Sequence, residues 1–148
     1  MSFSEDRRLY PGTHAAERPD APAVVVAATG QVTTWRELDE RSNQVAHLLA
    51  DIGLRRGDHI AIVAENHPTT FELVWAALRS GLYYTPVSSL LTQGEASEVL
   101  RATTARVLFA SSTSLPLAAE AADRAGGVTH RFAFGGPRVP GWTLLDES

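Results

Sequence analysis

Hydrophobic positions along the chain change their spacing several times, and each change marks an expected element. Four short apolar runs, rich in β-branched and aromatic residues, cover residues 59–64, 82–87, 106–110 and 128–134. Each run is too short for a helix, so we predict a strand in each place. Longer segments with helical spacing separate these runs. Strands and helices in alternation predict right-handed crossovers and a largely parallel sheet with flanking helices.

Two similar signals predict where helices begin. Thr34 is followed three residues later by Glu37, and Thr92 is followed in the same way by Glu95. In this capping-box spacing, each side chain can bind a free backbone N–H group at a helix start. The first helix is expected to run to about residue 52, with Gly53 ending it, and to pack by one apolar stripe. The stripe consists of Leu38, Val45, Leu48, Leu49 and Ile52.

A further helix is expected between residues 66 and 81. Asn66 is a suitable cap, Pro68 lies near the first turn where a missing N–H group costs nothing, and Gly81 follows the last helical position. Apolar residues recur at helical spacing within this segment, so they are expected to face the core. They are Phe71, Val74, Trp75 and Leu78.

Prolines and glycines mark the remaining boundaries. Pro86 cannot donate to a strand ladder, so the strand at residues 82–87 is expected to end there. The Ala-rich segment 114–124 predicts a helix that Gly126-Gly127 ends. Near the N-terminus, two short apolar runs joined at Thr29-Gly30 predict a β-hairpin.

These elements predict an α/β fold with a largely parallel sheet, flanking helices and an N-terminal β-hairpin. We assign residues 1–148 to one incomplete domain, with an N-terminal segment at 1–21, an α/β core at 22–134 and a cut-off loop at 135–148. A chain of 148 residues, 44% of them hydrophobic, is long enough for one hydrophobic core.

Composition excludes several classes of partner and compartment. The net charge of −4 is spread without a basic stripe, so a nucleic-acid partner is not expected. The chain has no cysteine, no apolar signal-peptide core and no apolar run near the ~20 residues that cross a bilayer. We therefore expect a cytoplasmic protein without an integral membrane segment. Arg7-Arg8 and Arg55-Arg56 leave peripheral membrane association open, although neighbouring acids favour a solvated face.

All 13 basic side chains are arginine, which excludes chemistry that needs a lysine amine. The histidines are scattered along the chain without paired acids at ligand spacing, so a metal site is not expected. The large aromatic residues are expected to be core rather than the wall of a substrate tunnel. The histidines are His14, His47, His59, His67 and His130, and the aromatic residues are Trp35, Trp75, Tyr83 and Tyr84.

Loops rich in serine or glycine are the remaining candidates for phosphate binding. Residues 111–114, with the sequence SSTS, lack glycine and lysine, so a strand-to-helix loop with a helix cap is the favoured interpretation. Gly126-Gly127 and Gly135-Gly136-Pro137 have no following lysine, which favours turns over phosphate cradles. We therefore assign no catalytic, cofactor-binding or metal-binding residue.

Several stretches resemble the adenylate-forming, or AMP-binding, enzymes. Thr33 to Leu38 is similar to the first core motif of that family, and Gly81 to Pro86 is similar to the second. Between them, Gly57 to Ile62 is similar to the family's Gly-Asp strand. The order and spacing of the matches over about residues 22–110 carry the resemblance, which is strongest to fatty-acyl-CoA synthetases. Further matches are Asn66 with Phe71, Leu91-Thr92, and Ala105 to Leu108.

The resemblance implies a parent enzyme that uses ATP, Mg²⁺ and CoA to convert a small-molecule carboxylate first to an acyl-adenylate and then to a thioester. It also implies that residues 1–148 form only the opening portion, because the family's glycine-rich loop and catalytic lysine are missing. One departure concerns Ser88, Ser89 and Leu90, which stand where the family commonly has Asp or Asn, then Pro and a basic residue.

Three functional hypotheses follow. The leading one is an N-terminal fragment of an AMP-forming acyl-CoA ligase that is inactive alone and binds none of the cofactors tightly. The second is a stand-alone interaction module that binds a partner or dimerises through an unfinished sheet edge. The truncated fragment of the first hypothesis is itself expected to expose apolar surface and to homodimerise through that edge or aggregate. The third, a flavodoxin-like nucleotide-binding protein, is weakened by the lack of a phosphate-binding loop after any strand.

Overall fold

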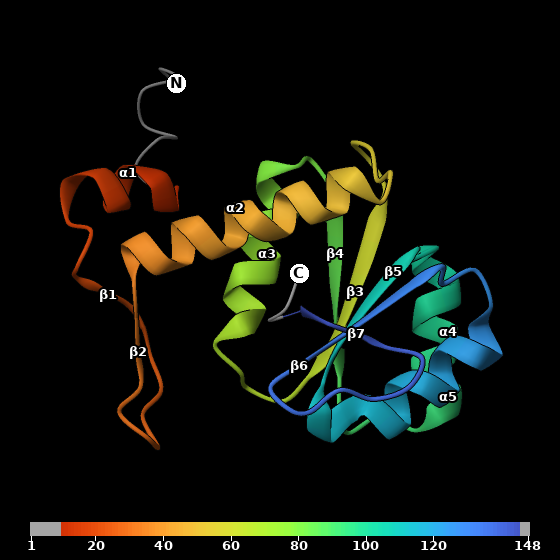
Figure 1. Ribbon diagram of the computed structural model, residues 1–148. Helices are drawn as coiled ribbons and strands as arrows, with labels where there is room; N and C mark the ends of the chain where they lie inside the picture. Colours follow the sequence, from red (N-terminus) through yellow and green to blue (C-terminus); the bar gives the residue numbers. More distant parts are fainter. Residues whose placement is uncertain (1–9, 146–148) are drawn as a thin grey trace.

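A computed structural model describes residues 10–145 and contains a five-stranded sheet in the order β4-β3-β5-β6-β7. Every neighbouring pair in this sheet is parallel, which confirms the predicted sheet type (Figure 1). The strands are β3 (His59–Ala64), β4 (Tyr83–Ser88), β5 (Val107–Ser111), β6 (His130–Phe134) and β7 (Thr143–Leu144).

Helices cover both faces of the sheet (Figure 1). On one face α2 (Trp35–Asp51) and α3 (Thr69–Arg79) pack over a cluster that includes Phe109 and Phe134; on the other, α4 (Gln93–Thr103) and α5 (Leu115–Ala125) pack over an alanine-rich cluster. Burying each large side chain contributes about 1.5–3 kcal/mol. The central strands β3 and β5 are apolar on both sides because neither of their faces meets water.

The order in which successive strands are added to the sheet reverses at β3, although all strands run in the same direction. The crossover through α3 places β4 on one side of β3, and the next crossover through α4 returns to place β5 on the other side. This order is that of flavodoxin-like sheets, in which ligands bind where the strand order reverses, at the carboxyl ends of the strands. The carboxyl ends of β3 and β5 are therefore the first place to look for a site.

The predicted hairpin is confirmed as a separate two-stranded antiparallel sheet of β1 (Pro22–Val25) and β2 (Val32–Thr34). A short helix that the sequence analysis missed, α1 (Pro11–Glu17), precedes it. This helix packs against α2, where the His14 ring lies tilted at 4.4 Å from Trp35; Tyr10, the residue before α1, meets Trp75 of α3 edge-on at 6.2 Å. Seven residues give little periodic signal, which explains why the pattern did not reveal α1.

Both predicted capping boxes are confirmed. The side chain of Thr34 accepts from the N–H group of Glu37, and the Glu37 carboxylate accepts from the N–H group of Thr34 at 2.8 Å; Thr92 and Glu95 repeat the arrangement at α4. Bonds from the backbone and hydroxyl of the threonine lower the pKa of each glutamate. Gly53 follows α2 with φ +89°, a conformation that suits glycine.

The predicted cap of α3 is wrong, and its apolar stripe is only partly right, since Val74 packs against the core but two other members do not. The helix begins at Thr69, whose N–H group donates to His67 Nδ1 at 3.2 Å, so Asn66 does not cap it. Phe71 and Leu78 are 50% and 49% exposed. Small side chains allow α3 to approach the sheet closely, and an ion pair to Arg41 at 3.2 Å makes burial of Glu72 tolerable. The buried residues are Glu72, Leu73, Ala76 and Ala77.

Strand β4 continues two residues beyond Pro86, contrary to the prediction. Because β4 is the edge strand, a missing N–H group at Pro86 breaks no ladder to a further strand. Tyr83, on the same strand, is 63% exposed and is therefore not core. The other three aromatic residues expected in the core, Trp35, Trp75 and Tyr84, are half-buried.

The tail at residues 135–148, expected as a loop, contributes the short strand β7 at the second edge of the sheet. Pairing of β7 with β6 required tertiary contact and left no periodic signal in two residues. Within residues 10–145, no helix combines the length and apolar character that crossing a bilayer demands.

Substituting the cap of α2 tests how much this helix start contributes to stability. Thr34→Ala removes the hydroxyl that accepts from Glu37, so we expect a loss of about 1 kcal/mol in unfolding free energy. Thr34→Ser keeps a capping hydroxyl and should stay close to the wild type. Urea unfolding monitored by circular dichroism measures both, and equal losses in the two variants would contradict the assigned cap.

Candidate functional site

Three loops meet at the carboxyl edge of the sheet. They follow β3, β5 and β6, and comprise residues 65–68, the short 3-10 helix η2 (Ser112–Ser114) that leads into α5, and the segment that starts at Gly135. The first two lie at the switch point, because β3 and β5 are the strands between which the order reverses. This edge is the candidate functional site of the described chain.

A carboxylate and three hydroxyl groups form the centre of this edge. Glu65 Oε2 accepts hydrogen bonds from Ser111 Oγ at 2.6 Å, from Thr113 Oγ1 at 2.6 Å and from Ser114 Oγ at 3.4 Å. Ser111 and Ser114 are buried, with 1% and 4% exposed, and their hydroxyl oxygens lie 3.0 Å apart. We call these four residues the Glu65 cluster. It ties the loop after β3 to the loop after β5.

The pKa of Glu65 is lowered below its ordinary value of 4.5. Partial burial acts to raise the pKa, but the hydrogen bonds from Ser111 and Thr113 outweigh it, and the nearby His67 also favours the charged form. The carboxylate therefore stays ionised without any Arg or Lys partner among the groups that lower its pKa. Hydroxyl donors thus stabilise this charge without removing it, and His67 assists them.

The third loop closes over the other two. Ser112 Oγ donates to the carbonyl of Gly135 at 2.9 Å, and His67 packs on Phe134 with ring centres 5.1 Å apart. A Cβ atom on Gly135 would lie 2.9 Å from His67 Nε2, and one on Gly136 would lie 2.5 Å from Ser112 Cβ. These glycines therefore permit close loop packing and leave no cradle at this point.

An open cleft of about 590 Å³ adjoins the Glu65 cluster. Its walls are the hairpin residues 24–28, the loop 65–68 and the apolar side chains of Phe71 and Pro86. Val25 and Phe71 remain 58% and 50% exposed there. Glu65 is the only carboxylate in the lining, and no arginine contributes to it. The cleft suits an uncharged apolar group better than an anion.

The described residues do not fit a bound nucleoside triphosphate. Phosphates require a backbone cradle with room for their oxygens, and cations beside them. The glycine pair is packed against His67 and Ser112, the chain has no lysine, and Glu65 places a negative charge among the hydroxyls. Residues 10–145 also contain no group of three or more His, Asp or Glu side chains arranged to hold a metal ion.

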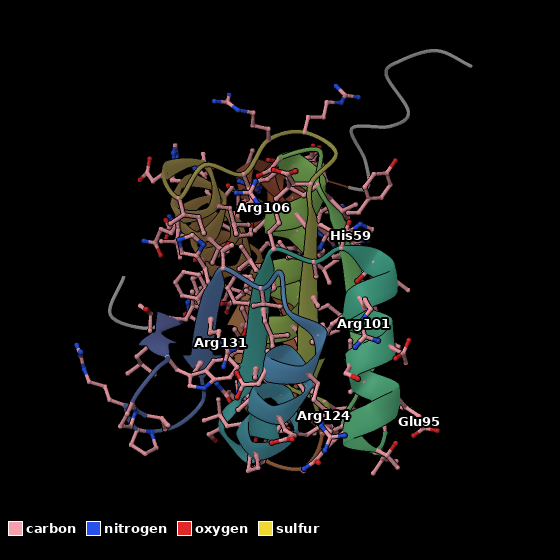
Figure 2. The ribbon with its side chains drawn as sticks, turned by 90° about the vertical axis from the view of Figure 1, so that its right-hand side faces the viewer. His59, Glu95, Arg101, Arg106, Arg124 and Arg131 are labelled. Carbon is pink, nitrogen blue, oxygen red and sulfur yellow. The ribbon has the colours of Figure 1, made fainter. Side chains whose placement is uncertain are left out.

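The arginines labelled in Figure 2, away from the carboxyl edge of the sheet, are paired with acids. Figure 2 shows His59 and Arg106 at the end of the sheet where β3 and β5 begin; Arg106 pairs with Asp58 at 3.1 Å. Arg101 pairs with Glu98, and the remaining labelled arginines on this side follow the same rule. They are Arg124, paired with Glu120 at 2.8 Å, and Arg131, paired with Asp123 at 2.6 Å. These arginines form no free basic patch.

The structure does not bring the histidines together. They lie in α1, in α2, at the start of β3, in the loop after β3 and at the start of β6. His59 stacks on Tyr83 at 5.1 Å, and His67 takes part in the loop packing described above. Arg55-Arg56 lies in a turn closed by a bond from the N–H group of Arg55 to Asp58, whereas Arg7-Arg8 lies outside the described residues.

The prediction that the serine-rich loop caps α5 is wrong. No side-chain bond caps α5, because the hydroxyls of Ser111, Thr113 and Ser114 donate to Glu65 instead. Sequence reasoning missed Glu65 as their acceptor. A signal was available: an acid that directly follows one buried strand must lie near polar residues that follow the neighbouring parallel strand.

The model of the AMP-binding enzyme family matches residues 12–141. Two curated relatives are similar. A fatty acid–[acyl-carrier-protein] ligase, ScoC, of Streptomyces coeruleorubidus is 33% identical over 96 residues, which are 65% of this chain and 18% of that protein. A 3-methylmercaptopropionyl-CoA ligase of Ruegeria lacuscaerulensis is 29% identical over 144 residues, which cover 90% of this chain and 26% of that protein.

Solved structures share the fold. A chain described as a long-chain-fatty-acid CoA ligase, from Rhodopseudomonas palustris, is 26% identical with a TM-score of 0.84, over 93% of this chain and 34% of that one. An anthranilate CoA ligase, AuaEII, solved with anthranoyl-AMP, has a TM-score of 0.85 at 20% identity, over 99% of this chain and 29% of that one. The chain thus spans about a third or less of the length of these relatives.

Protonation of Glu65 should weaken the fold at acid pH. Because its pKa is lower folded than unfolded, this carboxylate contributes stability above pH 4.5, and that contribution is lost as the pH falls through the folded-state value. Glu65→Gln lacks this contribution at every pH, so its stability deficit should shrink below pH 4.5. Urea unfolding between pH 3 and 7 tests this, with Glu40→Gln on the exposed face of α2 as control. A deficit independent of pH would contradict the assignment.

Close loop packing at Gly136 should make this position intolerant of a side chain. Gly136→Ala forces a Cβ atom against Ser112, so we expect a loss of about 1–3 kcal/mol in unfolding free energy. Gly94→Ala, in α4, meets nothing within 4 Å and should be neutral or stabilising by up to about 1 kcal/mol. Thermal unfolding of both variants compares them, and equal stability would show that the third loop is not packed as described.

Proposed function

Because the chain belongs to the AMP-binding enzyme family, we propose that it forms the N-terminal part of an ATP-dependent, AMP-forming acyl-CoA ligase that activates a fatty or related carboxylic acid. The relatives named above are ligases of fatty acids and other carboxylic acids, to an acyl carrier protein or to CoA, which supports a carboxylate substrate. Enzymes of this family use ATP; Mg²⁺ and CoA belong to the proposal for the longer enzyme.

The observation that carries the proposal is the match over residues 12–141 combined with a switch point that lacks a glycine cradle and an arginine or lysine for phosphates. Residues 10–145 therefore supply a scaffold on which the remaining two-thirds of a ligase would pack. Two features favour such packing: the hairpin β1–β2 forms a sheet of only two strands, which is marginal in isolation, and its Val25 and Val32 are 58% and 45% exposed.

A second candidate is a stand-alone module that dimerises through the free edge of β4. The exposed Tyr83 on that edge favours it. Pro86 on the same strand weighs against it, because a proline removes one donor from any new ladder. We therefore place this candidate second.

The purified chain of 148 residues should release no pyrophosphate above the buffer rate when incubated with a fatty acid, Mg-ATP and CoA, since no arginine lines the cleft at the switch point and the chain has no lysine. The matched control is the ligase from Rhodopseudomonas palustris, assayed whole and truncated to its equivalent first third. Extending the expressed reading frame beyond codon 148 should restore ATP–pyrophosphate exchange that depends on the acid. Turnover by the 148-residue chain would refute inactivity, and a native stop codon directly after codon 148 would favour the module.

A further inference from the structure

Three hydroxyl groups converge on one oxygen atom at the switch point. Ser111, Thr113 and Ser114 all lie within 3.4 Å of Glu65 Oε2, and two of the contacts are 2.6 Å long. Short O–H···O⁻ bonds of this kind are charge-assisted and are the type of contact that a phosphate oxygen accepts. Ser111 ends β5, and Thr113 and Ser114 lie in the segment that follows it, whereas the oxygen comes from the loop after β3, 46 residues away from Ser111. The three donors therefore meet a carboxylate from a separate part of the chain.

The donors also lie beside the start of α5. Ser114 immediately precedes this helix of 11 residues, and no side chain caps it. The positive end of the helix macrodipole favours a negative group here. Open α/β sheets bind anions at positions with three properties. These are hydroxyl donors, a helix start without a side-chain cap, and a location between the strands at which the strand order reverses. The structure places a carboxylate of its own chain there.

We use the term anion seat for the position formed by the hydroxyls of Ser111, Thr113 and Ser114 beside the start of α5. We propose that the carboxylate of Glu65 permanently occupies this anion seat and thereby excludes phosphate-bearing ligands from the switch point. Its carboxylate takes up the three hydroxyl donors and adds a negative charge that repels a second anion. This inference concerns the edge of the sheet alone and does not depend on whether the longer protein is a ligase.

The surroundings of the seat act in the same direction. The carbonyl of Gly135 accepts from Ser112, and the contact between Gly136 and Ser112 closes the space above the loop after β5. The adjoining cleft contains no arginine that would draw in a phosphate. A nucleotide used by the longer enzyme must therefore place its phosphates against other segments, and this edge is left to uncharged groups.

Removing the carboxylate should open the seat to inorganic phosphate. Glu65→Ala deletes both the charge and the volume of the side chain. Glu65→Gln removes only the charge and keeps the position filled. As a control elsewhere, Glu95→Ala removes a similar carboxylate, bound by Thr92, from the start of α4. Each variant and the wild type are titrated with sodium phosphate against sodium chloride of equal ionic strength. Thermal unfolding and amide chemical shifts at residues 111–114 are measured.

The expected result is selective. Glu65→Ala should show saturable shifts at residues 111–114, with a rise in Tm of about 3–6 °C at a tenfold excess over Kd. The wild type, Glu65→Gln and Glu95→Ala should show neither. Phosphate binding to these residues in the wild type, or a folded Glu65→Ala variant that ignores phosphate, would overturn the proposal. If Glu65→Ala fails to fold in chloride, phosphate should restore its structure, and failure to do so also counts against the proposal.

Discussion

The parallel arrangement of the sheet is the constraint from which the rest of this structure follows. Parallel strands cannot be joined by tight turns, so each connection must cross one face of the sheet as a helix. Both faces are thereby covered, and β3 and β5 are buried almost throughout. All strands also end at the same edge, so the polar residues that terminate them are gathered in one place. Glu65 and Ser111 meet for this reason, although they are far apart in the sequence.

A carboxylate at that edge has to be stabilised, and the chain does this with hydroxyl groups. An arginine partner would have placed a cation at the switch point. Other open α/β proteins bind their ligands at this position of the sheet. Hydroxyl donors lower the pKa of Glu65 while adding no charge. The same principle operates at both capping boxes, where threonine hydroxyls and backbone N–H groups hold Glu37 and Glu95 ionised. At the switch point, however, the acid bridges two loops, so it joins distant segments rather than closing one helix.

Local signals in the sequence predicted local structure well. Both capping boxes involve residues three positions apart, and the parallel order followed from the alternation of short apolar runs with helices. The face that α3 turns toward the sheet was not predictable in this way. Ala76 and Ala77 are buried there because the helix approaches the sheet closely, and small side chains give little hydrophobic signal in the sequence. The continuation of β4 beyond Pro86 depended on its edge position, which sequence order alone does not specify. The partner of the serine-rich loop depended on which strand became the neighbour of β5.

Membership of the AMP-binding family and the chemistry of this edge are compatible once the scaffold and the reactive groups are considered separately. Activation of a carboxylate by ATP requires cations where negative charge develops. Among the arginines of the α4–α5 side, each is paired with an acid, and the switch point carries a negative charge of its own. A unit of this kind contributes a rigid, doubly covered sheet and two exposed apolar surfaces, at the hairpin and around Phe71. Apolar surfaces beside an edge that carries a negative charge are suited to packing against further polypeptide.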